Sequence, residues 1–212
     1  MLQIATQALR LAAAAAVAVL LAGCVINSEN EIIGDAEAVP ALPDEMVLYP
    51  YERPSRSDAV PTYRVETGEP MGFTREANTY VSADGKMRVR MVPLDGQPDR
   101  YLAAIQSEDG YVYALAGFRD SILSLDVALV DPDPSAVLAS AQSAAGASPE
   151  LAGVSVIRGG IIVNSRAQLE AVLDLARAGT LSLATMILYA APDAQTPPPA
   201  TIIAEGDFFR AQ

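Results

Sequence analysis

The middle of the chain alternates apolar and polar residues with a period of two. In residues 86–92 the side chains of Met87, Val89 and Met91 share one face of an extended chain, and the basic residues that alternate with them share the other. Successive side chains of a β-strand point to opposite faces of its sheet, so this alternation predicts a strand with one buried and one solvated face. Such strands must fold so that their apolar faces meet.

The same pattern returns several times and is interrupted by turn sequences. Further strands are predicted at 80–83, 101–107, 111–118 and 122–130, with earlier candidates at 46–49 and 62–66. Asp-Gly pairs at 84–85, 95–96 and 109–110 separate them, and both residues of such a pair tolerate the positive φ of a tight hairpin. Strands joined by short turns pair antiparallel, which predicts a β-meander that curls towards a partial barrel.

The chain changes character after residue 134. Residues 135–147 are rich in Ala and Ser and suit either a short helix or a loop, and 154–163 reads as a buried strand. Ser165 and Gln168 form a capping box, and Gly179 marks the end of the helix that follows. With a strand at 181–190, this predicts a strand–helix–strand that either forms a crossover unit or lays its helix over the meander. The fold class is therefore α+β.

The segments outside the strands suggest a simple organisation. Residues 24–45 are acidic and interrupted by proline, which is typical of a flexible tether. Residues 46–190 form a single β-rich globular domain, and 191–212, with Pro197 to Pro199, form a mostly mobile tail. Two apolar stretches in the tail, 201–204 and 208–209, leave open an edge strand, a peptide that binds a partner, or chain ends without a specific role.

The first 24 residues combine three features in a fixed order. Arg10 and the amino terminus supply positive charge, an apolar run follows at 11–20, and the run ends in Leu21-Ala22-Gly23-Cys24. The run has about half of the roughly twenty residues that a membrane-spanning helix needs, which is the length of a signal-peptide core.

Leu21-Ala22-Gly23-Cys24 resembles the bacterial lipobox at all four positions. The resemblance implies that residues 1–23 are a lipoprotein signal peptide, that the chain is cut before Cys24, and that Cys24 carries the lipid that anchors it to a membrane. Residue 25 is Val rather than the Asp that retains lipoproteins in the inner membrane. The resemblance thus implies the periplasmic face of the outer membrane of a Gram-negative bacterium.

Composition excludes several kinds of chemistry. The chain has no histidine and a single cysteine, the one assigned to lipid, which excludes a Ser-His-Asp site, a zinc site of Cys or His ligands and an internal disulfide. The formal net charge of −12 argues against nucleic acid as a partner, because phosphate binding needs clustered Lys and Arg. We expect no cofactor and no metal.

The candidate site residues are therefore few. Tyr101, Tyr111 and Tyr113 fall in neighbouring strands and would line a ligand pocket or an interface if they shared one face. A ladder of aromatic residues that only stabilises the sheet is the alternative. The adjacent acids Glu108 and Asp109 lie in a predicted turn, where they cannot act across a cleft, so no catalytic residue is predicted.

Three classes of function remain open. The lack of catalytic groups favours a non-enzymatic envelope lipoprotein that binds a protein partner or supports an assembly. The alternative is a carrier of a small ligand or lipid, similar to a lipocalin, which requires a cavity inside the meander. A hydrolase that uses carboxylates alone would need two distant acids on opposite sides of a cleft.

Overall fold

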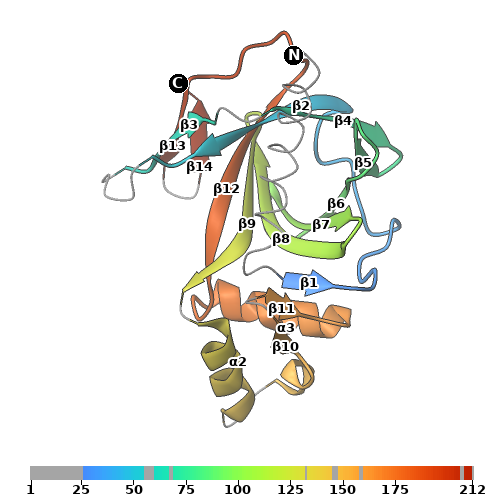
Figure 1. Ribbon diagram of the computed structural model, residues 1–212, viewed down its shortest axis with the longest axis vertical. Coiled ribbons are helices and arrows are strands. Elements are labelled where there is room, and N and C mark those ends of the chain that lie inside the picture. The colour runs from blue at the N-terminus through green and yellow to red at the C-terminus, as the bar shows by residue number, and fades with distance from the viewer. Residues whose placement is uncertain are drawn as a thin grey trace, which may run out of the picture.

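The alternating strands close into a barrel in the computed structural model of the protein (Figure 1). The structure describes residues 26–54, 60–66, 69–131, 133–144, 148–157, 160–205 and 208–211. The predicted signal peptide and Cys24 lie outside the described residues.

Eight antiparallel strands form the barrel, and each pairs with the next until the last meets the first. In order around the wall they are β2 (Glu45–Glu52), β4 (Met71–Glu76), β5 (Thr79–Ser82), β6 (Arg88–Pro93), β7 (Arg100–Ser107), β8 (Gly110–Arg119), β9 (Ile122–Asp131) and β12 (Ser182–Ala191). β12 closes the ring by pairing with both β9 and β2. The predicted meander is confirmed, and its partial barrel is in fact closed.

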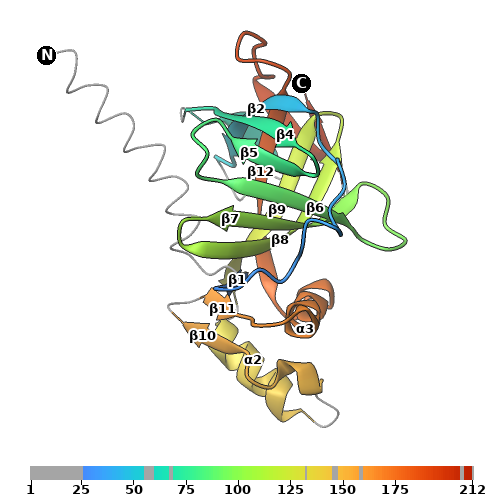
Figure 2. The same ribbon diagram turned by 90° about the vertical axis from the view of Figure 1, so that its right-hand side faces the viewer.

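Two groups of strands extend this wall. Beyond β8 lie β1 (Ile26–Ser28), β11 (Gly160–Ile162) and β10 (Ser155–Ile157), and beyond β2 lie β3 (Thr62–Val65), β13 (Thr201–Glu205) and β14 (Phe208–Ala211). Figure 2 shows the first group continuing the barrel wall away from β8. The predicted single strand at 154–163 is thus wrong, because the chain reverses there and forms the hairpin of β10 and β11.

The helices of the described part of the chain lie outside the barrel and do not cover an open face of the meander. They are α2 (Pro134–Ser143) and α3 (Arg166–Arg177), and a 3-10 turn at Pro149–Leu151 lies between them. The capping box is confirmed, because the Ser165 hydroxyl accepts a hydrogen bond from the Gln168 amide at 3.2 Å. Buried residues of α3 (Leu169, Val172 and Leu173) share an outer core with the outward side chains of β7 and β8, such as Leu102 and Tyr113.

The predicted tether at 24–45 is contradicted wherever the structure describes it. Ile26 begins β1, and Ile33, Ala38 and Leu42 are all buried against the barrel. We call residues 29–44 the strap. Four of its five acids are paired, since Glu31 and Asp35 contact Arg90, Glu37 contacts Arg166, and Asp44 contacts Arg75. Widely spaced apolar residues therefore dock a segment whose overall composition suggested disorder.

The predicted mobile tail is likewise ordered where it is described. Both apolar stretches of the tail are strands, because β13 pairs with β3 on one side and with β14 on the other. The edge-strand alternative therefore holds for 208–209 in β14, which ends the sheet, whereas 201–204 in β13 lie one strand inside the edge. Ile202 is fully buried beside Tyr51 and Tyr63. The tail belongs to the domain.

Candidate functional site

The barrel encloses a cavity of about 80 Å³ whose lining consists of apolar side chains. Alternation places every second residue of each strand on the inside, which is why Val89 and Met91 of β6 face Leu123 and Leu125 of β9 across the interior. The predicted inner face of residues 87–91 is therefore confirmed. No lining surface of the cavity is polar.

Methionine is concentrated around this cavity. Of the chain's six methionines, all but Met1 line it. These five are Met46, Met71, Met87, Met91 and Met186. Methionine is unbranched and polarizable, so its side chain adapts to ligands of different shape. An engineered apolar cavity of about 150 Å³ in another protein binds benzene. The cavity here is smaller, and the flexible methionine side chains allow it to widen at low cost.

The strap closes one end of the barrel. Leu42 reaches the cavity, and its backbone is fixed by the hydroxyl of Tyr80, which accepts from the Leu42 amide at 2.8 Å and donates to the Leu42 carbonyl at 2.6 Å. The amide of Val39 donates to the carbonyl of Met91 at 2.9 Å. Burial raises the pKa of Tyr80, so this hydroxyl stays protonated and keeps both bonds.

The opposite end of the barrel is more open. The lining side chains that keep partial solvent exposure gather there, and we call them the mouth: Met71, Met87, Val89, Ile105 and Met186. Met71 begins β4, and Met87 and Val89 follow the turn between β5 and β6. This end is therefore the more accessible route from solvent to the cavity.

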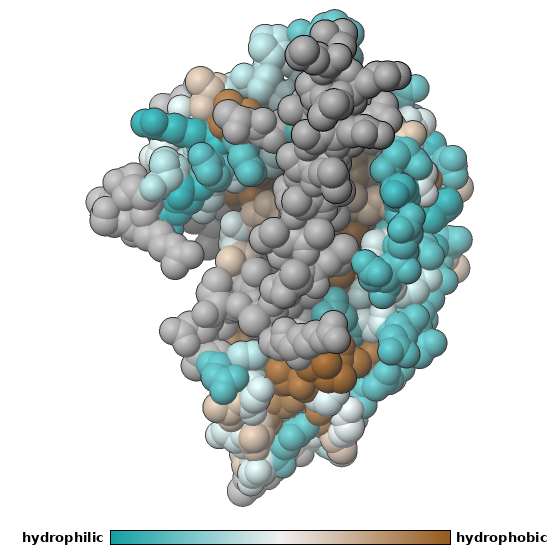
Figure 3. All heavy atoms as spheres, viewed as in Figure 1, coloured by the Kyte–Doolittle hydropathy of each residue, from teal (hydrophilic) through white to brown (hydrophobic). Residues whose placement is uncertain are grey.

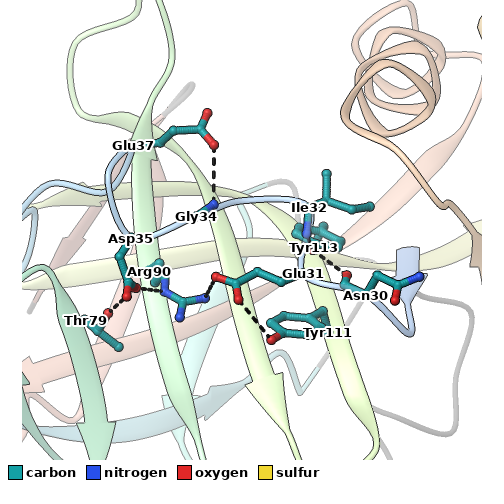
Figure 4. A network of polar contacts seen from close by, with 10 residues as sticks. All are labelled: Asn30, Glu31, Ile32, Gly34, Asp35, Glu37, Thr79, Arg90, Tyr111 and Tyr113. Atoms are coloured by element: carbon teal, nitrogen blue, oxygen red, sulfur yellow. Dashed lines mark hydrogen bonds and ion pairs between the residues drawn. The ribbon is translucent and has the colours of Figure 1, made fainter.

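A buried arginine holds the strap to the barrel wall. The side chain of Arg90 is only 7% exposed, and its Nη1 lies 2.9 Å from the Glu31 carboxylate while its Nε contacts Asp35 (Figure 4). Thr79 donates to the same Asp35 oxygen at 3.2 Å. The hydrogen bond and the charge of Arg90 lower the pKa of Asp35. Because Arg90 lies between Val89 and Met91, this contact joins the strap to two side chains that line the cavity.

The three predicted tyrosines do not share one face. Tyr101 packs against the barrel interior, whereas Tyr111 and Tyr113 lie on the outer surface of β8. The Tyr113 hydroxyl accepts from the Ile32 amide at 3.0 Å, and the Tyr111 hydroxyl lies 3.5 Å from Glu31. These two tyrosines hold the first part of the strap, as Figure 4 shows.

The charged side chains offer little chemistry near the cavity. Glu108 lies in an exposed turn 3.6 Å from Lys86, and no group of three or more metal-ligating His, Cys, Asp or Glu side chains converges within the described ranges. The residues that sequence reasoning missed are Leu42, Tyr80 and the Arg90 contacts. The run of methionines on inward positions was the one signal that could have pointed to the cavity.

No protein-family model, curated protein or solved structure matches the chain. Neither of the described helices has the length and apolar character required to cross a membrane. The fold and the cavity together define a closed, antiparallel eight-stranded barrel with an apolar interior.

Proposed function

We propose that this protein is a non-enzymatic bacterial envelope lipoprotein whose barrel binds an acyl chain or a similarly apolar small molecule. The observation that carries the proposal is the cavity, which is lined by apolar side chains and by five methionines. It favours the carrier alternative over the assembly module, since an assembly module has no need of an interior space.

The driving force for such binding is burial of hydrocarbon. Each methylene transferred from water to an apolar site contributes about 0.8 kcal/mol. The cavity presents no polar group to fix the orientation of a headgroup, so we expect selection for chain length and shape rather than for headgroup. A binder of this kind accepts a family of related chains.

The anchor is the second part of the proposal. The lipobox supports lipid on Cys24, and two or three acyl chains hold a protein on a membrane almost permanently. The proposed location remains the periplasmic face of the outer membrane. An envelope protein that receives or delivers the ligand fits this setting as a partner.

A photoreactive fatty acid tests the cavity. We expect a diazirine fatty acid, irradiated with the membrane-anchored protein, to form adducts on lining residues such as Met91 and Leu125. Ile105→Trp narrows the mouth and should reduce these adducts several-fold. Gln106→Trp, one residue along β7 on the opposite face, is the matched control and should leave them unchanged. Adducts confined to the outer surface, or equal loss in both variants, would contradict the proposal.

Metabolic labelling tests the anchor separately. Cells that make the protein with Cys24 intact should incorporate radioactive palmitate into it, and Cys24→Ser should abolish the label. The product of the variant should also keep its leader, because the lipoprotein peptidase cuts the lipid-modified chain. Equal labelling of the two proteins would refute the anchor.

A further inference from the structure

The position of β1 relates the proposed anchor to the mouth of the barrel. Asn27 of β1 is the register partner of Val112 on β8, whose side chain lines the cavity. Val112 in turn pairs with Ile105, and Ile105 pairs with Val89, both residues of the mouth. A single line of paired residues thus runs from β1 to the mouth across neighbouring strands.

Chain length then limits where the lipid can be. Cys24 precedes Ile26 by two residues, and two residues of extended chain span at most about 7 Å. Because Ile26 is paired with Tyr113 and Ile161, the described domain begins two residues after the proposed anchor. The surface around Ile26 must therefore lie at the membrane.

This surface carries exposed apolar side chains. Ile157 of β10 is 58% exposed. Its register partner is Gly160, the residue just before Ile161, which pairs with Ile26. It is displaced from Ile26 in the direction from which the anchored chain arrives, two strand spacings or about 10 Å away. Figure 3 shows apolar side chains gathered over β10 and β11, beside β1.

We infer that the mouth of the barrel faces the bilayer that carries the anchor, so that the cavity takes its acyl chain directly from that leaflet. This inference rests on the proposed anchor at Cys24. The strap supports the orientation, because it closes the far end with Leu42 and leaves the mouth as the more open end.

Charge at the mouth indicates which kind of bilayer fits. The turns that join β5 to β6 and β7 to β8 carry Asp84, Lys86, Glu108 and Asp109, an excess of negative charge. At headgroup level these acids repel anionic lipid, so the partner is a zwitterionic surface such as phosphatidylcholine or phosphatidylethanolamine.

Single tryptophans can report the orientation, because the chain contains none. We would reconstitute the lipidated protein in phosphatidylcholine vesicles whose acyl chains carry bromine, a contact quencher of tryptophan fluorescence. The variants are I157W beside the anchor, K86W beside the mouth and Q97W in the turn between β6 and β7 at the far end. All three positions are exposed, so each variant should fold.

We expect the tryptophan emission of I157W and K86W to be mostly lost in brominated vesicles relative to vesicles without bromine, and the emission of Q97W to be unchanged. Adding anionic phosphatidylglycerol should weaken the quenching of K86W. Quenching of Q97W in place of K86W, or of none of the three, overturns the orientation.

The quenching result is independent of the cavity test. Cavity adducts without quenching of K86W would leave the binding function intact and reject only the orientation. Quenching of K86W without cavity adducts would keep the orientation and reject the binding function. A protein that fails to float with the vesicles would reject the anchor and the orientation together.

Discussion

The hydroxyl of Tyr80 makes two hydrogen bonds to the backbone of Leu42, one as donor at 2.6 Å and one as acceptor at 2.8 Å. Tyr80 belongs to the barrel wall and Leu42 to the strap, and both are buried. A buried backbone amide and carbonyl without partners would be costly, so this one side chain makes closure of the barrel end favourable.

Tyr80→Phe should therefore lower the free energy of unfolding by about 1–3 kcal/mol, because it leaves both groups of Leu42 without a partner. Urea unfolding followed by circular dichroism measures this change. Tyr111→Phe is the comparison, since the hydroxyl that it removes contacts the exposed Glu31 side chain at a longer distance of 3.5 Å and leaves no buried backbone group without a partner. Equal effects of the two variants would mean that the strap does not depend on Tyr80.

Arg90→Met should also weaken the strap. It keeps much of the side-chain volume but removes the partner of Glu31 and Asp35, and we expect a loss of about 1–3 kcal/mol because a hydrogen bond to a charged group contributes that much. Arg88→Met is the matched control on the same strand, since Arg88 is 42% exposed and lies 3.6 Å from Glu76. A surface pair of that kind contributes less than about 1 kcal/mol. Thermal unfolding of both variants separates the two cases.

The strap contact should depend on acid pH. Arg90 lowers the pKa of Asp35 in the folded chain below its usual value of 3.8. The pair thus stabilises the fold above that value and loses its contribution as the pH falls through the lowered pKa. Because Asp35 is 73% exposed, the effect should stay below about 1 kcal/mol.

The measurement is the difference in Tm between the protein and Asp35→Asn. The difference should be present at pH 7 and should shrink below pH 3.8 towards zero. A difference that is constant across this range would show that the carboxylate charge of Asp35 plays no part in holding the strap.

Sequence periodicity predicted most of the barrel strands because alternation is a local property. Closure was not predictable in this way, since β2 and β12 pair across more than a hundred residues and no turn joins them. The strap was missed because all of its charged residues are acidic, while its docking depends on three buried apolar side chains, those of Ile33, Ala38 and Leu42. The arginine partners of its acids lie elsewhere in the sequence, at positions 75, 90 and 166.

The candidate site was harder to predict than the fold. Alternation shows which side chains point inward, but only the arrangement of all eight strands shows whether they fill the interior. The tyrosine faces were within reach of sequence reasoning, because Tyr101 pairs with Ala116 across the hairpin and Tyr113 lies three residues from Ala116. An odd separation along a strand places side chains on opposite faces.

A charge placed inside the barrel should be tolerated only near the mouth. Leu125 is 6% exposed, so Leu125→Asp loses core packing and buries a carboxyl group without a partner. Together these effects should unfold a domain whose total stability is about 5–15 kcal/mol. Val89 keeps partial exposure at the mouth, so Val89→Asp can hydrate its carboxylate and should be destabilising but folded.

Gln106→Asp controls for the added charge. Gln106 lies on the outer face of β7, one residue after Ile105, the register partner of Val89, so this variant should change stability by less than about 0.5 kcal/mol. Circular dichroism and urea unfolding of the three variants should therefore rank them with Leu125→Asp lowest and Gln106→Asp close to the parent protein. If Val89→Asp unfolds the chain as completely as Leu125→Asp, water does not reach this end of the barrel. An acyl chain would then need another route into the cavity, since the mouth is the route that the partial exposure of Val89 and Ile105 supports.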